Sequence, residues 1–346
     1  MYGRRSSLIM GALLFFLSLL YGISVRLRIR AYACGLLRSK KLPLKVISVG
    51  NLTVGGTGKT PVVIQISDML RKQGRRPVVL SRGYGRSDAS RTVMVSDGAG
   101  SIMDARTGGD EPALIARRLP GVPVVAGSDR YRAGMFAIGR LHPDVVVLDD
   151  GFQHLRLSRD RNILLVDASN PFGSGRLFPA GILREPLTAM RRADAVLLTK
   201  ADSAGDLEAL KRTIIAHTPA RIFTARHAPR SLVNVASGDE RPLASLSGTP
   251  VLAFAGIARP DSFASLLKDL GAEVRVMIGY PDHYQYTAAD LTGLVQRARE
   301  QGAMLVTTEK DGVRLKDMAS EGIWALRIDL EVLEKQEWEK VLLQGL

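Results

Sequence analysis

The sequence has a single cysteine, Cys34, among its 346 residues. An internal disulfide framework is therefore excluded, and a reducing compartment is expected. Aromatic residues make up only 5% of the chain and no basic segment is interleaved with stacking rings, so we expect no nucleic acid among the partners. The histidines lack the spacing of metal ligands. Acidic residues are also in deficit, 34 against 48 basic ones, and the net charge of +14 indicates an anionic partner such as an acidic membrane surface or a phosphorylated substrate.

Charge is missing altogether from one long stretch near the N-terminus. Ser6 to Val25 is an uncharged run rich in Leu, Phe and Ile, long enough as a helix to cross a hydrocarbon core of about 30 Å. A cleaved signal peptide is the alternative, but the run is long for one, and Arg26, Arg28 and Arg30 follow at once. We therefore predict a membrane-associated helix over residues 1–30, with its basic flank on the cytoplasmic side. Whether this helix spans the membrane or lies in one leaflet stays open.

The strongest motif lies between Val46 and Thr60, Val-Ile-Ser-Val-Gly-Asn-Leu-Thr-Val-Gly-Gly-Thr-Gly-Lys-Thr. An apolar, β-branched run leads into a glycine-rich turn, and apolar residues at helical spacing follow until Gly74. Strand, glycine loop and helix in this order are typical of a phosphate-binding P-loop. Thr53 stands where the usual motif has Gly, and Val54 stands where dimerising partition ATPases have Lys, which argues against that group.

The glycines of this loop allow positive φ, so that backbone N–H groups converge on phosphate oxygens at a helix N-terminus. We predict that Lys59 reaches the β- and γ-phosphates of ATP and that the Thr60 hydroxyl ligates Mg²⁺. The predicted nucleotide-binding residues are Thr53, Val54, Gly55, Gly56, Thr57, Gly58, Lys59 and Thr60.

Short apolar runs alternate with helical patterns along the rest of the chain. This alternation predicts an α/β fold, a P-loop NTPase-like parallel sheet with helices on both faces. The predicted strands are 46–49, 78–80, 122–126, 145–148, 163–166 and 195–199. After a looser segment, a second series has strands over 251–254, 274–278 and 303–307 and helices over 261–270 and 288–301. We predict a P-loop domain over 31–228, a linker over 229–249, and a smaller α/β domain over 250–346 that closes a cleft.

Polar residues directly after apolar runs are candidate site residues, because ligands of parallel sheets bind at the carboxyl ends of the strands. Asp149 and Asp150 follow the run 145–148 and occupy the place of a carboxylate beside Mg²⁺. Asp110 opens the helical pattern 113–119. It would make a good N-cap there, and that structural role alone could explain the residue. The segment 170–186 shows little secondary-structure signal, and long loops of that kind in compact domains are usually functional.

The run Thr199-Lys-Ala-Asp202 favours a different nucleotide. It resembles the Asn-Lys-x-Asp element with which GTPases bind guanine, although Thr replaces the Asn and no convincing Asp-x-x-Gly switch accompanies it. A membrane-associated P-loop GTPase, or an assembly factor gated by nucleotide, therefore stays as the alternative to a kinase. The GTPase predicts guanine selectivity, and neither alternative predicts a phosphorylated lipid product.

Taken in order, several motifs resemble those of the tetraacyldisaccharide 4'-kinases of lipid A biosynthesis. They are Val49-Gly-Asn-Leu-Thr-Val-Gly-Gly-Thr-Gly-Lys-Thr-Pro61, Leu80-Ser-Arg-Gly-Tyr-Gly-Arg86, Gly109-Asp-Glu-Pro112, Leu148-Asp-Asp-Gly-Phe-Gln-His154, Leu183-Arg-Glu-Pro186 and Pro281-Asp-His-Tyr284. The resemblance covers nearly the whole chain, and Thr53 is ordinary in that family. It implies an ATP-dependent lipid kinase that transfers the γ-phosphate to the 4'-hydroxyl of an acylated glucosamine disaccharide 1-phosphate. The expected place is the bacterial inner membrane, with the catalytic domains on the cytoplasmic side and no obligate protein partner.

The resemblance also implies roles for single residues. Asp110 matches the catalytic carboxylate of the family, and His283 matches its partner, although a lone loop histidine is more often a surface residue. An Asp–His pair lets the histidine carry the proton while the carboxylate orients it, or the reverse. The predicted catalytic residues are Asp110, His283, Lys59 and Asp150. The predicted Mg²⁺ ligands are Thr60, Asp149 and Glu185, and the expected phosphate clamps are Arg82, Arg130 and Arg184.

Overall fold

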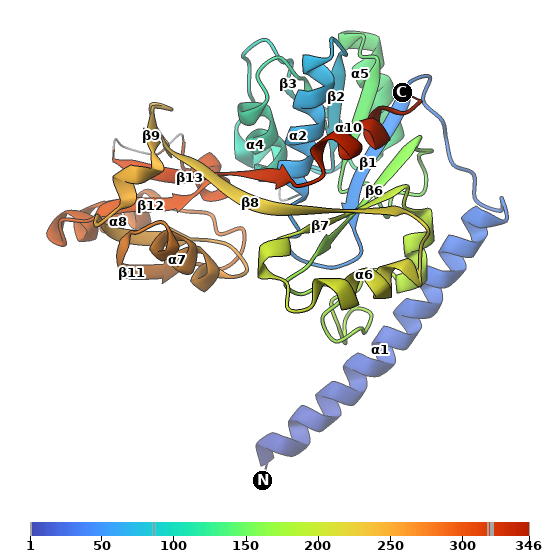
Figure 1. Ribbon diagram of the computed structural model, residues 1–346, viewed down its shortest axis with the longest axis horizontal. Helices are drawn as coiled ribbons and strands as arrows, with labels where there is room; N and C mark the ends of the chain where they lie inside the picture. Colours follow the sequence, from blue (N-terminus) through green and yellow to red (C-terminus); the bar gives the residue numbers. More distant parts are fainter. Residues whose placement is uncertain (1, 85, 87, 317, 319–321, 346) are drawn as a thin grey trace. The chain divides into compact units, whose positions relative to one another are not determined.

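The computed structural model describes residues 2–84, 86, 88–316, 318 and 322–345 (Figure 1). The chain forms two compact units, and neither is continuous in sequence. The first contains residues 1–82, 127–226 and 330–346, and the second contains 83–126 and 227–329. The continuous domains predicted over 31–228 and 250–346 differ from this division chiefly in 83–126, which packs with the second unit. The pattern of apolar runs predicts strands but not the unit they pack in, so the sequence did not predict that 83–126 belongs to the second unit.

The first unit is built on a parallel sheet in the order β8-β7-β6-β1-β5-β2. Each strand predicted in this unit is present. These strands are buried on both faces, so nearly all of their side chains are apolar, and this is why they appear in the sequence as continuous β-branched runs. The strands are β1 (Lys45–Asn51), β2 (Pro77–Ser81), β5 (Val145–Asp149), β6 (Arg161–Asp167), β7 (Ala195–Thr199) and β8 (Arg221–Asn234). The helices are α1 (Tyr2–Ala33), α2 (Lys59–Lys72), α5 (Arg130–Leu141), α6 (Leu207–Ile215) and α10 (Lys335–Leu343), with 3-10 turns at Leu187–Arg192 and Ala201–Ser203.

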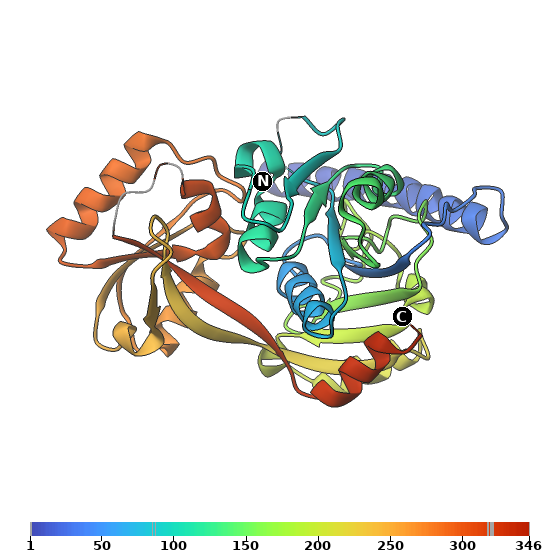
Figure 2. The ribbon, with the colours of Figure 1, turned by 90° about the horizontal axis from the view of Figure 1, so that it is seen from above.

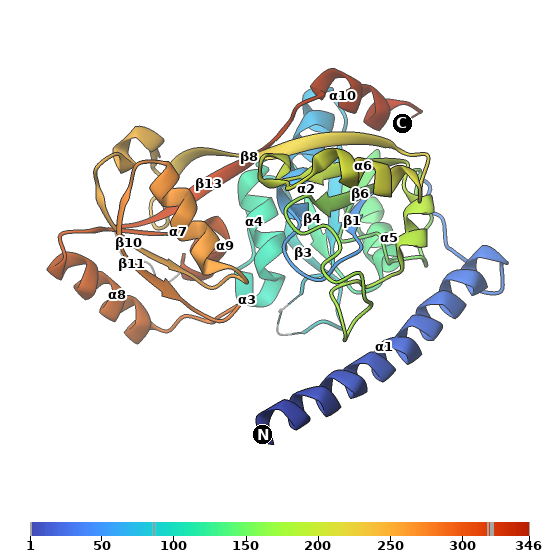
Figure 3. The ribbon, with the colours of Figure 1, turned by 60° about the horizontal axis from the view of Figure 1, so that its bottom comes forward.

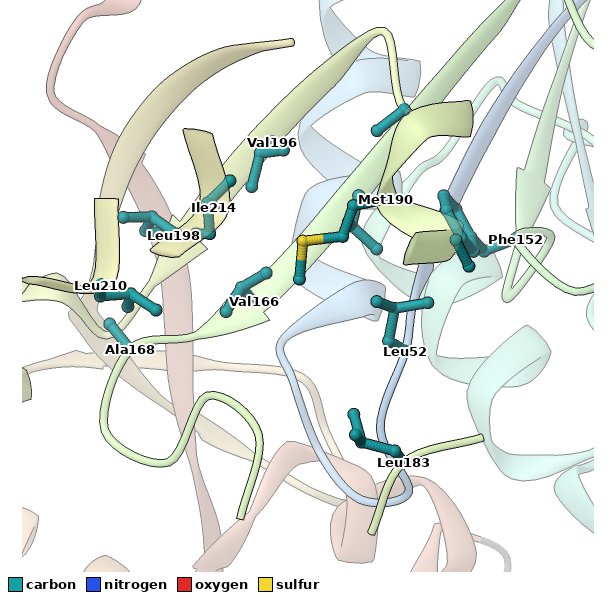
Figure 4. Close-up of a cluster of buried hydrophobic side chains, with 13 residues drawn as sticks. Leu52, Phe152, Val166, Ala168, Leu183, Met190, Val196, Leu198, Leu210 and Ile214 are labelled. Carbon is teal, nitrogen blue, oxygen red and sulfur yellow. The ribbon is translucent and has the colours of Figure 1, made fainter. Parts of the chain in front are cut away.

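Helices cover both faces of this sheet, as predicted. From β1 the chain crosses through α2 toward one edge, and from β7 it crosses through α6 toward the other. Right-handed crossovers in opposite directions put the two helices on opposite faces, as Figures 1 and 3 show. Beneath α6, the side chains of Val166, Val196 and Leu198 pack with Leu210 and Ile214 in one buried cluster (Figure 4). At this edge of the sheet α10 lies beside β8, as Figure 2 shows. Trp338 of α10 packs edge-on against Phe223 of β8, with ring centroids 5.2 Å apart.

The second unit contains a smaller parallel sheet in the order β11-β10-β12-β13. Alternate residues of its central strand face different helices: Val251, Ala253 and Ala255 pack against α7, whereas Leu252 and Phe254 pack against α8. This strict alternation is the two-residue period of a strand buried on both faces. The strands are β10 (Pro250–Ala255), β11 (Glu273–Gly279), β12 (Met304–Thr308) and β13 (Ile323–Val332), and the helices are α7 (Pro260–Asp269), α8 (Ala288–Glu300) and α9 (Glu309–Leu315).

The inserted segment adds two strands and two helices to the second unit. They are β3 (Val93–Ser96), α3 (Ala105–Gly108), α4 (Asp110–Arg118) and β4 (Val124–Ala126). β3 pairs antiparallel with β4 and was not predicted, because it is only four residues long and half-exposed at its start. The predicted strand over 122–126 is confirmed in its second half.

The segment 229–249, predicted as a linker, is structured. β8 continues to Asn234, β9 (Glu240–Pro242) pairs antiparallel with it, and a 3-10 turn follows at Leu243–Leu246. The middle of β8 is half-exposed, and its charged residues and proline weakened the strand pattern. The chain passes from one unit into the other within β8 and again within β13.

The predicted N-terminal helix is present as α1, which extends to Ala33 (Figure 1). Within the described residues, Met10–Ala33 is long and apolar enough to cross a membrane by length and composition. Its large exposed side chains include a stripe at helical spacing, Met10, Leu13, Phe16, Leu20, Ile23 and Leu27. A second stripe, Leu14, Ser18, Tyr21, Gly22, Val25 and Ile29, is buried or half-buried. α1 therefore presents one face to its own unit and a largely apolar stripe outward.

Candidate active site

The P-loop joins β1 to α2, as the sequence indicates. Gly55 has φ 113° and Gly58 has φ 80°, conformations that favour glycine. Gly58 is the N-cap of α2 and makes no side-chain capping bond, so the first N–H groups of the helix remain available to an anion. A Cβ added at Gly55 or Gly56 would meet nothing within 4 Å, so packing does not demand these glycines. Their freedom serves the loop conformation that binds phosphate.

Three neighbouring segments hold the P-loop in place. Val54 N–H donates to the Ile182 carbonyl at 2.7 Å, within the long loop predicted to be functional. The buried Thr199 hydroxyl, at the end of β7, donates to the Thr57 carbonyl at 3.0 Å. The buried Asn51 amide donates to the Thr53 carbonyl at 3.0 Å, and its Oδ1 accepts from Lys59 Nζ at 3.5 Å. These hydrogen bonds fix the loop to the segments around it.

Two consecutive carboxylates follow β5 and have different surroundings. Asp149 is buried, and its Oδ2 accepts a hydrogen bond of 2.8 Å from Ser81 at the end of β2. Asp150 has a left-handed backbone, φ 51°, which turns its carboxylate toward Lys59 Nζ at 3.6 Å and Arg184 at 2.9 Å. Burial raises the pKa of Asp150, but Lys59 and Arg184 outweigh it and hold the pKa below its ordinary value. The structure therefore joins Lys59, Asp150 and Arg184 in one charged group.

Glu185 and Arg130 have other partners. Glu185 is buried, forms an ion pair with Arg192, and accepts a bond of 3.3 Å from Gln153. The buried Arg130 donates to the Asp149 carbonyl at 3.4 Å. Arg82 is exposed, and Gly85 of the neighbouring glycine-arginine motif lies outside the described residues. Across the described ranges, no group of three or more His, Cys, Asp or Glu residues gathers in the way a protein-only metal site requires.

Asp110 and His283 meet within the second unit, although 173 residues separate them. His283 Nδ1 lies 3.1 Å from Asp110 Oδ2. His283 has φ 61°, and its ring packs edge-on against Tyr84 with centroids 5.4 Å apart. The histidine is thus not the isolated surface residue that its loop position suggested. Asp110 is not an N-cap either: Gly109, with φ 95°, caps α4, and Asp110 is the first helical residue.

Helix α9 surrounds this pair with cations. Arg314 Nε donates to Asp110 Oδ2 at 2.7 Å, and Lys310 Nζ lies 3.2 Å from His283 Nε2. Burial raises the pKa of Asp110, but the His283 hydrogen bond and the Arg314 charge more than offset it, so the pKa lies below its ordinary value. In the tautomer whose Nδ1–H donates to Asp110, the lone pair of His283 Nε2 faces the Lys310 ammonium.

Sequence reasoning missed Asn51, Lys310 and Arg314. A signal existed for the last two, because Glu309-Lys-Asp311 follows the apolar strand β12 just as Asp149 and Asp150 follow β5. Asn51 carried no such signal, since a single asparagine before a P-loop is not a distinctive sequence pattern. The GTPase-like run has a structural role: Thr199 holds the P-loop, Lys200 pairs with Asp167 at 2.5 Å, and Asp202 is exposed.

A strand, P-loop and helix with an acidic pair after a neighbouring parallel strand define the class: the first unit has the nucleotide-binding architecture of a P-loop phosphotransferase. The sequence profile of the family described as "LpxK: Tetraacyldisaccharide-1-P 4'-kinase" matches residues 10–346. The chain therefore belongs to the tetraacyldisaccharide 4'-kinase family, which confirms the resemblance noted in the motifs.

Relatives and a solved structure agree with this assignment. The tetraacyldisaccharide 4'-kinase of Syntrophus aciditrophicus is 44% identical over 339 residues, covering 94% of this chain and 91% of the relative. That of Geobacter metallireducens is 42% identical over 334 residues, covering 96% and 97%. The crystal structure of LpxK from Aquifex aeolicus in complex with ATP has a TM-score of 0.82 and 37% identity, covering 97% of this chain and 99% of that one. The predicted α/β fold and the predicted activity, an ATP-dependent phosphotransferase with an alcohol acceptor in lipid A biosynthesis, are confirmed.

Proposed function

We propose that the chain transfers the γ-phosphate of ATP to the 4'-hydroxyl of a tetraacyldisaccharide 1-phosphate with nucleotide held by the P-loop and the hydroxyl proton taken up by Asp110 and His283. The proposed uptake of the proton rests on the 3.1 Å contact between the Asp110 and His283 side chains, which are 173 residues apart in the sequence. In the reaction the 4'-oxygen bonds to the γ-phosphorus, the bond from that phosphorus to the β,γ-bridging oxygen breaks, and ADP leaves.

Nucleotide binding rests on the first unit. The uncapped N-terminus of α2 and the backbone of Thr53–Thr60 bind the phosphates, and Lys59 supplies positive charge to the β- and γ-phosphates. Lys59 and Arg184 both contact Asp150, which holds the two cations near each other. A γ-phosphate competes with Asp150 for these cations, and Arg184 is the phosphate clamp with the best geometric support.

The residues near the P-loop fit Mg²⁺. Thr60 and Asp149 offer hard oxygen ligands, which Mg²⁺ prefers, and the phosphates of ATP supply further oxygens, so no protein-only cage is needed. When bound, the ion neutralises charge that develops on the phosphate oxygens. Asp150 and Glu185 each form an ion pair with an arginine. We therefore assign Asp150 to positioning Lys59, and we rank Glu185 below Thr60 and Asp149 as a candidate Mg²⁺ ligand.

Proton uptake rests on the second unit. Asp110 stays ionised over the working pH range, since its pKa is lowered, and it accepts from Nδ1–H of His283. His283 then offers the lone pair of Nε2 to the acceptor hydroxyl once that hydroxyl displaces the Lys310 ammonium. Proton removal of this kind accelerates a reaction by roughly 10²–10⁴-fold.

The contacts of α1 favour a helix that lies in one leaflet. The Ser18 hydroxyl donates to the Leu177 carbonyl at 2.8 Å, and the Tyr21 hydroxyl donates to the Arg184 carbonyl at 2.9 Å, within the loop that also holds the P-loop. Residues from about Leu14 onward thus face their own unit. We infer a helix embedded along its apolar stripe in the cytoplasmic leaflet of the inner membrane, where its acylated substrate also resides.

The reaction is tested with ATP labelled in the γ-phosphate and a tetraacyldisaccharide 1-phosphate in detergent micelles. Wild type should label the lipid, Lys59→Ala should not, and Lys72→Ala, at the exposed far end of the same helix, should behave as wild type. Chelation of Mg²⁺ should abolish transfer. Label that appeared only as free phosphate, with GTP preferred to ATP, would refute the proposal.

The topology of α1 is tested separately. In a Cys34→Ser chain with Ser7→Cys, a helix in the cytoplasmic leaflet leaves the new thiol unreactive toward an impermeant maleimide in intact spheroplasts and reactive after lysis. Reaction in intact spheroplasts would show that the helix spans the membrane.

A further inference from the structure

Arg314 is the most deeply buried cation of the second unit's polar cluster. Its side chain is 2% exposed, and all three guanidinium nitrogens have contacts. Nε donates to Asp110 Oδ2 at 2.7 Å, Nη1 donates to Asp311 Oδ1 at 2.9 Å, and Nη2 lies 3.2 Å from His283 Nδ1. A single planar group therefore touches both members of the proposed catalytic pair. Lysine, with one point charge, cannot reproduce this arrangement.

Asp311 anchors this arginine. Its carboxylate is fully buried and accepts hydrogen bonds from the Gly256 amide at 3.1 Å, the Tyr286 hydroxyl at 3.1 Å and the Thr308 hydroxyl at 2.6 Å. These donors come from the end of β10, the segment before α8 and the N-cap of α9. The position of Arg314 is thus fixed by several elements of the unit, and the arginine transmits that position to Asp110.

The charges around the pair explain why a second cation is needed. Asp110 and Asp311 are two buried carboxylates, and Arg314 lies between them as the shared counterion. On the other side of His283, Lys310 contacts Nε2 and lies 3.8 Å from Glu111 and from Asp282. Tyr84 packs on the ring. Without Arg314, a buried Asp110 would face only the imidazole, and protonation of the carboxylate would relieve the cost of burial.

We propose that Arg314, anchored by Asp311, is a positioning residue that keeps the Asp110 carboxylate ionised and aligned with Nδ1 of His283. This inference rests on the catalytic roles of Asp110 and His283 given under the proposed function. Arg314 holds Asp110 whichever nitrogen of the imidazole carries a proton. When Nδ1–H donates to Asp110, the Nε bond to Oδ2 remains, because a carboxylate oxygen accepts more than one hydrogen bond.

The test uses the full chain and follows kcat, KM and the pH dependence of kcat/KM in the lipid-labelling assay. For Arg314→Ala, kcat should fall on the order of 10²-fold, the size expected when a catalytic group is misplaced by about 1 Å. The acidic limb of the pH profile should move to higher pH, since Asp110 loses the charge that lowers its pKa. Arg314→Lys should keep part of the activity and shift the limb less.

Chemical rescue separates positioning from folding. Arg314 lines a cavity of about 430 Å³ together with Thr107, Gln285 and Tyr286. Added guanidinium at millimolar concentration can therefore occupy the space that Arg314→Ala vacates, and it should restore much of kcat. The matched control is Arg118→Ala, which removes another part-buried arginine of the same unit, one that pairs with Glu309 and Asp329. It should lower Tm without moving the pH limb, and guanidinium should not change its kcat.

The outcomes separate this inference from the proposed function. If Asp110→Asn and His283→Ala keep wild-type kcat, the proposed catalytic roles fail and the inference fails with them. If those variants are impaired while Arg314→Ala keeps wild-type kcat and pH profile, only the inference is overturned. A loss in Arg314→Ala that matches its fall in Tm, with no shift of the limb and no rescue, would also overturn it. Should Arg314→Ala not fold, the same pH criterion applies to Arg314→Lys.

Discussion

The hydroxyl of Thr199 links the end of β7 to the P-loop and gives a sharp test of how that loop is held. Its Oγ1 donates to the Thr57 carbonyl at 3.0 Å, with the Val166 carbonyl farther away at 3.4 Å, and the residue is 0% exposed. Thr199→Val keeps the shape and removes the donor. The Thr57 carbonyl is then left in a buried setting without its hydrogen bond, which costs about 1–3 kcal/mol.

Part of this cost should appear as weaker binding of ATP. If about 1 kcal/mol goes into loosening the loop conformation that binds phosphate, KM for ATP rises about fivefold, since 1.4 kcal/mol corresponds to tenfold. KM for the lipid acceptor should stay unchanged. The assay is transfer of labelled phosphate at varied ATP, with Tm measured on the same preparations.

The chain offers a matched control in Thr307, at the end of β12 in the second unit. It is also 0% exposed, and its hydroxyl donates to the Phe254 carbonyl at 2.8 Å. Thr307→Val should lower Tm by a similar amount and leave KM for ATP as in wild type. Equal rises of KM in both variants, or a wild-type KM in Thr199→Val, would refute the claim that this hydroxyl organises the P-loop.

Three further predictions concern stability, pH and the membrane. Phe152→Ala empties a fully buried site in the cluster beneath α6 and should lower the free energy of unfolding by about 3–5 kcal/mol, measured by denaturant titration. The pKa of Asp110 is lower in the folded state than in the unfolded state, where it is about 3.9. The ionised carboxylate therefore stabilises the fold above that pH, and this contribution is lost as the pH falls further. Tm of Asp110→Asn should decline less steeply than that of wild type below about pH 4. Leu20→Glu, in the outward stripe of α1, should reduce flotation with anionic vesicles, whereas Ile215→Glu, at a position of α6 that is at least as exposed, should float as wild type.

The sequence predicted the P-loop and its strand and helix because every part of that site is contiguous. Phosphate is bound by the backbone of Gly55 to Thr60 and by the helix that follows, so local residue types determine the geometry. Asp149 and Asp150 were found for a related reason, since the carboxyl end of a buried strand is visible as the end of an apolar run. The same rule, applied to β12, would have drawn attention to Lys310.

The domain division was not predictable in this way. The segment 83–126 interrupts the first unit and packs with the second, and β8 runs through the stretch expected to be a linker. Both facts depend on which surfaces are buried together, and a half-exposed strand with arginines and a proline carries a weak local signal.

The amino-acid sequence by itself determined the fold class, the phosphate-binding loop and, through its ordered motifs, the family. Only the tertiary structure brought His283 to Asp110 across 173 residues, placed Arg314 and its anchor Asp311 behind them, and turned one stripe of α1 toward its own unit. The physical reason is the range of the interactions. Backbone conformation and periodicity depend on near neighbours, whereas a buried cluster of charges exists only where distant segments exclude water together.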